Sequence, residues 1–263
     1  MSTTLTSEQI AAYHRDGFIC GLPPLFSADE MREHNRGLEE LLRLLRPGED
    51  ARAIREWHES SRWLYDLCLD PRILDRVEGL LGPDFFLWAS NFFIKPARSS
   101  STVAWHQDAY YWGLRPLFRT VTVWLAFTDT DLANGAMWVV PGTHQAGLLV
   151  HRRHDPGASA SVLNLELEQG TFREDSAVAL ELPAGCASLH DDGIVHGSPA
   201  NTSDRPRIGL TMRYSAACVT CDPVANPHFK TYLCRGVDTY RHNRAGPVPT
   251  VRYARTDFTP RDP

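Results

Sequence analysis

From Phe85 to Tyr214 the chain consists of short apolar or alternating segments, and turn residues such as Asn134-Gly135 separate several of them. Alternation with a period of two is typical of β-strands, and no helical pattern lies between these segments. About eight strands without intervening helices favour two packed sheets, a jelly roll, over a parallel α/β sheet. The predicted strands are 85–95, 103–108, 119–129, 137–140, 177–182, 186–190, 194–196 and 207–214.

The first third of the sequence carries helix signals instead. Two capping-box pairs and one Asp-Pro pair predict three helix starts. The predicted helices begin after Thr6, Ser27 and Asp70 and end at Gly17, Pro47-Gly48 and Gly82. We expect these helices to pack on the outside of the sheets.

The chain is expected to form one domain over 1–263, with a helical part at about 6–82, a jelly-roll core at about 85–215 and a C-terminal extension at 216–263. The segment 158–175 is largely polar and is predicted to be a mobile loop over the barrel mouth. The segment 243–263, rich in proline and arginine, is predicted to dock loosely or to be disordered.

The overall composition excludes several classes of protein. The hydrophobic fraction of 43% supports a sizeable core, and 27 basic against 32 acidic residues give a net charge of −5. This balance argues against nucleic acid or an anionic membrane as the main partner. Neither an apolar run of about 18 residues nor a secretory leader is found. We therefore expect a cytoplasmic monomer or homodimer that acts on a small molecule.

The six cysteines are too sparse for a disulfide scaffold and are expected to be reduced. Cys218-Val-Thr-Cys221, with His228 and Cys234 nearby, leaves a zinc site open as an alternative. A single CxxC without a second pair is a weak zinc signal. Structural cysteines are therefore the favoured interpretation.

His106-Gln107-Asp108, together with the distant His196, is the strongest candidate for a chemical site. Side chains at i and i+2 of a strand project to the same side, so His106 and Asp108 can reach one ion, and His196 would arrive on another strand. Two imidazoles and one carboxylate form a facial triad, which binds Fe(II) and leaves positions for a cosubstrate and O2. Gln107 points to the other side and is not expected to be a ligand.

Arg207 opens the predicted strand that follows His196. Its planar guanidinium can form two parallel charge-assisted hydrogen bonds with a carboxylate near the metal. A cosubstrate that chelates iron at one end and carries a carboxylate at the other, such as 2-oxoglutarate, would fit. Arg205 is an alternative anchor, but it precedes Pro206 in a turn.

Several segments between about Leu5 and Tyr214 resemble the phytanoyl-CoA dioxygenase family of Fe(II)/2-oxoglutarate oxygenases. The resemblance implies a double-stranded β-helix, a cupin-like jelly roll. It also implies an enzyme that couples the conversion of 2-oxoglutarate to succinate and CO2 to the oxidation of an unactivated C–H bond. The segments that carry it are Trp105-His106-Gln107-Asp108, Asn134-Gly135 through Pro141-Gly142-Thr143-His144, and His196-Gly197-Ser198 with Arg207.

The resemblance implies roles for individual residues. The metal ligands would be His106, Asp108 and His196, and the positions that bind 2-oxoglutarate would be Arg207, Ser198, Trp124 and Asn91. Core packing explains Trp124 equally well. Relatives with Ala or Gly in place of the aspartate leave a coordination site for chloride and halogenate. Asp108 therefore favours hydroxylation, or desaturation or ring formation.

Other histidines and aspartates of this region have simpler explanations. Asp191 or Asp192, which closely precede His196, would orient a loop or a ligand imidazole rather than bind metal. We assign His144 to a turn, and His151, His154 and Asp155 to a solvated loop at the pocket rim.

Substrate contacts are expected from aromatic and inward-facing side chains. Tyr110 and Trp112 follow the iron motif, so their loop must border the metal. The other candidates, on strands that would face the barrel interior, are Trp88, Met137 and Arg213. A buried cation needs an anion. Arg213 would therefore meet either a carboxylate of the protein, which is slightly favoured, or an acidic substrate.

Two other functions are compatible with parts of this pattern. A jelly-roll protein could retain the motif and bind a ligand without catalysis, and iron-dependent succinate release would distinguish that case. Zinc hydrolysis is disfavoured, because the ligand set matches no hydrolytic signature and Arg207 would lack a purpose. The sequence thus predicts an oxygenase of a small metabolite that uses Fe(II), 2-oxoglutarate and O2.

Overall fold

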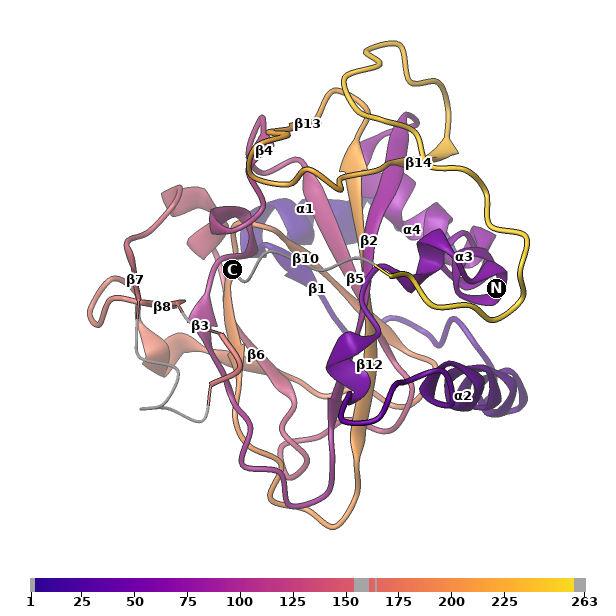
Figure 1. Cartoon of the computed structure of the whole chain (residues 1–263). Coiled ribbons are helices and arrows are strands. Elements are labelled where there is room, and N and C mark those ends of the chain that lie inside the picture. The colour runs from indigo at the N-terminus through magenta and orange to yellow at the C-terminus, as the bar shows by residue number, and fades with distance from the viewer. Residues whose placement is uncertain (1–2, 154–160, 164, 258–263) are drawn as a thin grey trace.

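The computed structural model describes residues 3–153, 161–163 and 165–257. Two antiparallel sheets contain all the predicted strands, with ends that differ by a few residues (Figure 1). Their strands are β1 (Phe18–Ile19), β2 (Phe85–Lys95), β3 (Val103–His106), β5 (Thr120–Ala126), β6 (Met137–Val140), β9 (Val178–Leu180), β10 (Ala187–Asp191), β11 (Val195–Ser198), β12 (Arg207–Ala216) and β14 (Tyr232–Arg235). The larger sheet has the order β1-β10-β5-β12-β2-β14, and the smaller one the order β3-β11-β6-β9. The predicted jelly roll is confirmed.

Several short strands were not predicted, because two to four residues are too few to show an alternating pattern. Besides β1 and β14, they are β4 (Leu114–Arg115), which pairs with β13 (Thr220–Cys221), and β7 (His151–Arg153), which pairs with β8 (Leu165–Leu167). The strand β8 lies in the segment 158–175, so the prediction of a loop throughout that segment is wrong. Residues 158–160 and 164 lie outside the described residues.

In the described part of the chain, the α-helices are α1 (Ser7–Asp16), α2 (Ala28–Leu42), α3 (Arg62–Cys68) and α4 (Pro71–Leu81). Both capping boxes form, and Pro71 occupies the first turn of α4. Helix α2 ends at Leu42, before Pro47-Gly48, because the chain tightens into i→i+3 bonds such as that from the Leu44 N–H to the Leu41 carbonyl, at 3.0 Å. None of these helices has the length and apolar character needed to cross a bilayer.

Helix α3 was not predicted, because Ser61 precedes it without the Glu or Gln at the third helical position that completes a capping box; Leu64 stands there. The Ser61 hydroxyl makes no capping bond and donates instead to the carbonyl of Arg252, at 3.0 Å. The first N–H groups of a helix lack partners within the helix. Here the C-terminal tail supplies them, since the N–H groups of Arg62 and Trp63 donate to the carbonyls of Val251 (2.7 Å) and Arg252 (3.0 Å). The described part of the predicted loose tail is therefore packed on α3.

The two faces of the larger sheet differ in chemistry. Its outer face is apolar and packs against the helices, which lie behind and to the right of the sheet in Figure 1. Leu210, Met212 and Tyr214 of β12 alternate outward into this main core. The inner face carries Arg213, whose guanidinium reaches Asp108 beside the smaller sheet.

Cross-strand pairing aligns the inner residues in rows, because directly opposed residues of antiparallel strands point to the same face. One row contains Asn91, Thr211, Trp124 and Ser188. The next row contains Ala89, Arg213, Thr122 and His190. Most of these side chains are polar, which is unusual for the interior of a small barrel.

Candidate active site

Three potential metal ligands converge on the inner side of the smaller sheet. His106 ends β3, Asp108 begins the 3-10 helix η3 (Asp108–Tyr110), and His196 lies on β11 directly opposite His106. One ligand atom from each residue lies within 4.8 Å of the other two. His106 Nε2 is 3.5 Å from Asp108 Oδ1, and His196 Nε2 is 4.0 Å from Asp108 Oδ2. All three side chains are buried.

Backbone carbonyls fix the orientation of both imidazoles. His106 Nδ1 lies 2.8 Å from the carbonyl of Ala104, and His196 Nδ1 lies 3.0 Å from the carbonyl of Ile194. A carbonyl can only accept, so we assign the proton to Nδ1 in each ring. The Nε2 lone pairs are then available on the side that faces Asp108.

The electrostatics of this cluster suit a cation. Burial raises the pKa of the Asp108 carboxyl, but Arg213 and the two imidazoles outweigh burial and hold that pKa well below its ordinary value. Burial, with His106 adjacent, lowers the pKa of His196 well below its ordinary value. At neutral pH the site therefore offers a carboxylate and a neutral imidazole, the states that metal ligation requires. This donor set fits Fe(II).

Two buried cations lie together at the start of β12. Arg207 is 3% exposed, and its Nη1 donates to the carbonyl of Gly135 at 2.9 Å. Lys95, its cross-strand partner on β2, donates to the Ser198 hydroxyl at 2.8 Å. Burial lowers the pKa of Arg207 to about 10, and burial together with Arg207 lowers that of Lys95 to about 7. Two buried cations that no acidic side chain of the described residues offsets fit a bound carboxylate.

Lys95 was not among the predicted site residues, although strand alternation places it on the inner face. Lys95 and Asn91 are an even number of positions apart on β2, so they share the inner face. Arg205, the alternative anchor, lies outside this group. Its side chain is exposed and pairs with Asp131 at 2.5 Å.

Trp124 forms a wall beside Arg207, whose guanidinium carbon lies 5.4 Å from the centre of the indole. The ring lies across Gly209, where a Cβ would come within 2.0 Å of it. A larger residue than glycine at this position would therefore displace Trp124. Asn91 lies farther along the barrel: in the orientation that satisfies both amide atoms, its Oδ1 accepts from Arg213 Nη1 at 2.8 Å.

Six buried polar atoms without a hydrogen-bond partner lie on the inner face of the larger sheet. An unpaired buried polar atom costs about 1–3 kcal/mol, so an interior retains a group of them where a ligand or water completes the bonding. A dicarboxylate such as 2-oxoglutarate fits such a place, between the metal ligands and Arg207. In the described residues these atoms include the hydroxyls of Thr122 and Ser188, both ring nitrogens of His190, and Nε of Arg207 and of Arg213.

Three of the predicted substrate residues lie together at one end of the interior. The rings of Trp88 and Trp112 are 4.9 Å apart, and the Arg213 guanidinium carbon is 4.8 Å from the Trp112 ring. Trp88 is held by a hydrogen bond from its indole nitrogen to the Ser215 hydroxyl, at 3.0 Å. These residues form a mixed aromatic and cationic surface close to Asp108.

The other two predicted substrate residues lie apart from this surface. Tyr110 is 41% exposed and stacks on His151, with ring centres 4.0 Å apart. Met137 belongs to a separate apolar cluster with Val139, Leu180 and Ile194.

The remaining polar residues of the motif region have structural contacts. Gln107 holds two loops, since its amide nitrogen donates to the carbonyls of Gly147 (2.9 Å) and Gly193 (2.7 Å). The Asp191 carboxylate accepts from the Gly193 N–H at 2.8 Å, so it orients a loop and not a ligand imidazole. His144 Nε2 lies 3.1 Å from the carbonyl of His14, in a turn as expected.

His151 was expected in a solvated loop, and this prediction is wrong. The residue is buried on β7, and its Nε2 accepts from the Gln107 N–H at 3.1 Å. The short pairing of β7 with β8 gave no sequence signal, so the burial of His151 could not be foreseen. His154 and Asp155 lie outside the described residues.

The alternative zinc site does not form in the part of the chain that the structure describes. The only group of three potential metal ligands there is His106, Asp108 and His196. Cys218 and Cys221 pack in the hydrophobic cluster around Trp88. Burial raises the pKa of Cys221 to about 11, so its thiol is protonated at neutral pH.

Comparisons with known proteins agree with this geometry. Among curated proteins, the ectoine dioxygenase of Streptomyces coelicolor is 26% identical over 247 residues, which cover 85% of this chain and 82% of the relative. Among solved structures, the non-heme monooxygenase ThoJ in its apo form is 30% identical with a TM-score of 0.78, covering 92% of this chain and 89% of that one. CytC3, solved with Fe(II) and α-ketoglutarate, is 25% identical with a TM-score of 0.69, covering 97% of this chain and all (100%) of that one.

The sequence profile of the phytanoyl-CoA dioxygenase family matches residues 13–209. This range includes the three clustered metal-ligand candidates and both buried cations. The chain therefore belongs to the phytanoyl-CoA dioxygenase family and is a non-heme dioxygenase that uses Fe(II), 2-oxoglutarate and O2.

Proposed function

We propose that this enzyme hydroxylates an unactivated C–H bond of a small metabolite and that His106, Asp108 and His196 hold its iron. The observation that carries the ligand set is the orientation of the two imidazoles, whose Nδ1 atoms are engaged by carbonyls so that both Nε2 atoms face one carboxylate. When bound, Fe(II) supplies the activation of O2, coupled to the conversion of 2-oxoglutarate to succinate and CO2. The protein positions the reacting groups and encloses them in an interior with little water.

In this proposal Arg207 and Lys95 bind the far carboxylate of 2-oxoglutarate. Arg207 has an Nε without a partner, and the Lys95 ammonium gains its missing counter-charge when a carboxylate binds. The Ser198 hydroxyl accepts from Lys95 and keeps the ammonium in place. Trp124 and Asn91 belong to one row of the inner face and are proposed to line the cosubstrate site.

Asp108 supports hydroxylation over halogenation. Its carboxylate lies where it can occupy a coordination position that a halide would otherwise need. Desaturation and ring closure begin from the same loss of hydrogen, and the substrate decides among these outcomes. The substrate is proposed to lie against Trp88 and Trp112, near Arg213, with Tyr110 at the rim. Met137 packs among apolar side chains, so we propose no substrate contact for it.

The direct test is succinate release by the purified protein with Fe(II), 2-oxoglutarate and a panel of small metabolites that includes ectoine. We expect release that requires iron, rises with at least one member of the panel, and is lost in His196→Ala. His144→Ala is the matched control, because this imidazole contacts the carbonyl of His14 near the end of α1 and is not a proposed iron ligand, so the reaction should persist. If no iron-dependent succinate forms under any condition, the chain is a binding protein that retains the motif.

We also propose that the whole chain is one domain, because β14 of the C-terminal extension pairs with β2 of the larger sheet. The cytoplasmic location and the monomeric or homodimeric state stay predictions from the sequence.

A further inference from the structure

His190 is a buried imidazole that makes none of its possible hydrogen bonds. It is 1% exposed, and neither of its ring nitrogens has a partner. Each of the other buried imidazoles in the described part of the chain uses at least one ring nitrogen, as His58 does toward the Ser90 hydroxyl at 2.8 Å. Buried polar groups are retained without a protein partner where a ligand or water completes their bonding. His190 therefore indicates a place where another molecule binds.

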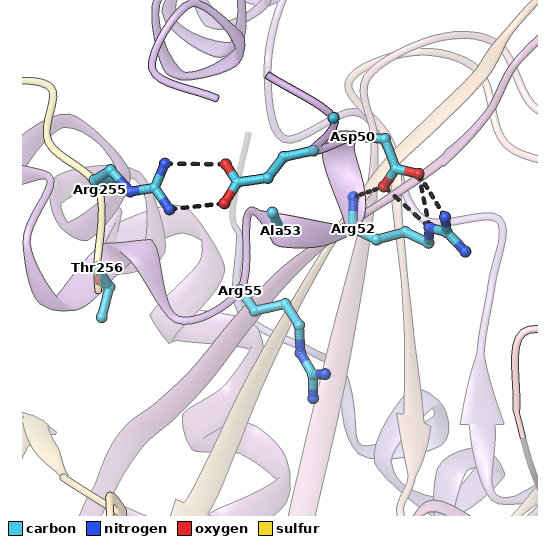
Figure 2. A pocket seen from close by; sticks show the side chains of 8 residues that line it. Asp50, Arg52, Ala53, Arg55, Arg255 and Thr256 are labelled. Carbon is cyan, nitrogen blue, oxygen red and sulfur yellow. Dashed lines mark hydrogen bonds and ion pairs between the residues drawn. The ribbon is translucent and has the colours of Figure 1, made fainter. Parts of the chain in front are cut away.

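The surface pocket beside the 3-10 helix η1 (Ala51–Ala53) differs in this respect. Its charged side chains pair with one another, since Asp50 accepts from Arg52 at 2.6 Å and Glu49 accepts from Arg255 at 3.0 Å (Figure 2). These pairs are complete without a ligand, whereas the imidazole of His190 is not.

His190 belongs to a row of inner-face side chains that spans the cluster of metal-ligand candidates. Across the larger sheet His190 is opposite Thr122, and Thr122 is opposite Arg213. At one end of the row, the His190 ring centre lies 5.0 Å from that of His196. At the other end, Arg213 Nε lies 4.0 Å from Asp108 Oδ2. Thr122 stands between them, and its buried hydroxyl has no partner.

The open positions of a bound metal would face this row. A facial triad occupies one side of the metal and leaves the opposite positions to the cosubstrate and O2. All three ligand candidates come from the smaller sheet or from the turn that follows β3, so the opposite side is that of the larger sheet. His190 is outside the group whose ligand atoms lie within 4.8 Å of one another. Its nitrogens are therefore placed to bond a group on the metal and not the metal itself.

The Arg213 end of the row already has partners. The guanidinium lies near Asp108 and interacts with the carboxylate of Glu56, so the protein supplies the anions that this buried cation needs. Beside it stand the rings of Trp88 and Trp112, the proposed substrate surface. This end is therefore suited to the substrate.

The His190 end of the row is closed by apolar side chains. Phe18, directly opposite His190 on β1, packs against a cluster that offers no hydrogen bond; its members are Met137, Val139, Leu180 and Ile194. A partner for the imidazole therefore comes from the interior, beside the metal ligands.

The cosubstrate has the length to bring such a partner. Its far carboxylate is proposed to bind Arg207, whose guanidinium lies against Trp124. Trp124 and Thr122 are two positions apart on β5, so they share the inner face. At about 3.3 Å per residue their Cα atoms are about 7 Å apart, a distance that a five-carbon dicarboxylate spans between its ends. The carboxylate at the iron end then arrives beside Thr122 and His190.

We propose that the His190 imidazole and the Thr122 hydroxyl donate hydrogen bonds to the iron-chelating carboxylate of 2-oxoglutarate and hold it on the side of the metal away from Trp88 and Trp112. An imidazole has an N–H in either protonation state, and a hydroxyl has a proton to donate. Hydrogen bonds to an ionised oxygen are roughly twice as strong as those between neutral groups. The side next to the tryptophans is left for O2 and the substrate. This inference deepens the proposed function and rests on it.

The test uses a ligand that lacks only the chelating carboxylate. Levulinate keeps the ketone and the far carboxylate of 2-oxoglutarate and has a methyl group in place of the carboxylate at the iron end. Protein loaded with Mn(II) is titrated calorimetrically with each of the two ligands. The ratio of the levulinate Kd to the 2-oxoglutarate Kd measures what the chelating carboxylate contributes, without any turnover.

Variants of His190 should change that contribution alone. His190→Leu removes the donor at similar size, so the Kd of 2-oxoglutarate should rise about 10-fold or more while that of levulinate is unchanged. Thermal unfolding of the ligand-free variant should show no loss of stability, because no hydrogen bond within the protein is lost. His190→Gln keeps an N–H donor and should restore most of the affinity.

Two further variants are controls. Arg207→Ala should weaken both ligands and leave the ratio unchanged, because it acts on the carboxylate that they share. His58→Leu should change neither Kd, because this imidazole is equally buried but lies in the main core against Tyr232. If His190→Leu does not fold, Thr122→Val provides the test at nearly constant volume, with a rise of about threefold in the Kd of 2-oxoglutarate.

The outcomes separate this inference from the proposed function. An unchanged Kd of 2-oxoglutarate in His190→Leu, or in Thr122→Val where His190→Leu does not fold, would mean that water completes these groups and would overturn the proposal. An equal rise for levulinate, or a loss of Mn(II) binding without cosubstrate, would also overturn it. If the unaltered protein binds neither Mn(II) nor 2-oxoglutarate, the proposed function itself fails.

Discussion

The two faces of the larger sheet are built from the same strands, yet they differ in how many polar side chains they carry. On the outer face, the Tyr214 hydroxyl is buried and donates to the Cys68 carbonyl at 2.6 Å, and its neighbours on β12 are apolar. On the inner face, Thr122, His190 and Arg213 keep buried atoms without partners. The outer face packs the main core, where the hydroxyls of Tyr13 and Tyr232 also lack a partner, whereas the inner face gathers polar groups that we propose ligands complete.

The largest effect should come from removing the one carboxylate of the iron site. Asp108→Asn keeps the shape of the side chain but removes the negative charge that faces both imidazoles. Loss of a residue that only hydrogen-bonds to a metal ligand typically lowers metal affinity ~10–100-fold. Loss of the ligand charge itself should lower iron affinity by more than this, and product formation should cease. Iron content after dialysis and succinate release measure this, with far-UV circular dichroism as the check on folding. Normal iron binding and full activity would show that the triad is misassigned.

Neighbouring residues of β12 test the difference between the faces. Leu210→Ala leaves a cavity in the main core, so unfolding should become easier by about 2–5 kcal/mol while the KM for 2-oxoglutarate stays constant. Thr211→Val, one position along and on the inner face, should have a much smaller effect on stability. Urea denaturation of both variants, with kinetics in parallel, measures this. An equal loss of stability in the two would contradict the assignment of the faces.

Of the two nearby arginines, Arg207 and Arg205, only Arg207 should be needed to bind 2-oxoglutarate. Arg207→Ala removes a buried guanidinium and should raise the KM for 2-oxoglutarate roughly 30- to 1000-fold, equivalent to about 2–4 kcal/mol. Arg205→Ala serves as the matched control, because that side chain is exposed and paired with Asp131. Steady-state kinetics at saturating substrate distinguish the two. A larger rise in this KM for Arg205→Ala than for Arg207→Ala would show that Arg205, and not Arg207, binds 2-oxoglutarate.

Lys95 should make cosubstrate binding depend on pH. Burial and the adjacent Arg207 lower the Lys95 pKa to about 7 in the free protein, and a bound carboxylate favours the charged ammonium. Binding above that pKa therefore takes up a proton, and the affinity for 2-oxoglutarate should fall as the pH rises above about 7, by up to ~10-fold per unit. The dependence of 2-oxoglutarate affinity on pH is measured by titration with Mn(II) in place of iron, in unaltered protein and in Lys95→Met. The same pH dependence in both proteins would show that Lys95 does not cause it.

The smallest effect should be a gain in stability on the inner face. The Thr122 hydroxyl is buried without a partner, so Thr122→Val removes an unpaired group at nearly constant volume. The ligand-free protein should become more stable by about 1 kcal/mol, and ligand binding should weaken. Thermal unfolding of the variant and of the unaltered protein, with and without Mn(II) and 2-oxoglutarate, measures the stability of the ligand-free and ligand-bound forms. A loss of stability in the ligand-free variant would mean that the hydroxyl already has a partner.

Much of the fold was predictable because the barrel strands alternate strongly and the helices carry capping pairs. The grouping of His106, Asp108 and His196 was predictable from residue type, from the spacing of His106 and Asp108, and from the resemblance of the surrounding segments to the family. Lys95 was not predicted, although alternation along β2 places it on the same face as Asn91. Short paired strands such as β7 and β8 have too few residues for an alternating pattern to be recognised.

Arg55 and α3 could not have been predicted from local sequence. The segment around Arg55 pairs with the edge of β2 at Asn91, past the residues of β2 that β14 covers. Helix α3 begins where the distant tail supplies carbonyls to its first N–H groups. Both are set by contacts between segments far apart in the chain, and no short pattern encodes them.

The most direct test of the account is a crystal structure grown without O2 in the presence of Fe(II) and 2-oxoglutarate. We predict iron bound to His106 Nε2, His196 Nε2 and the Asp108 carboxylate, with the far carboxylate of 2-oxoglutarate between Arg207 and Lys95 and Arg213 free of it. Iron on other residues, or the far carboxylate on Arg205 or Arg213, would contradict the assignment of the inner face.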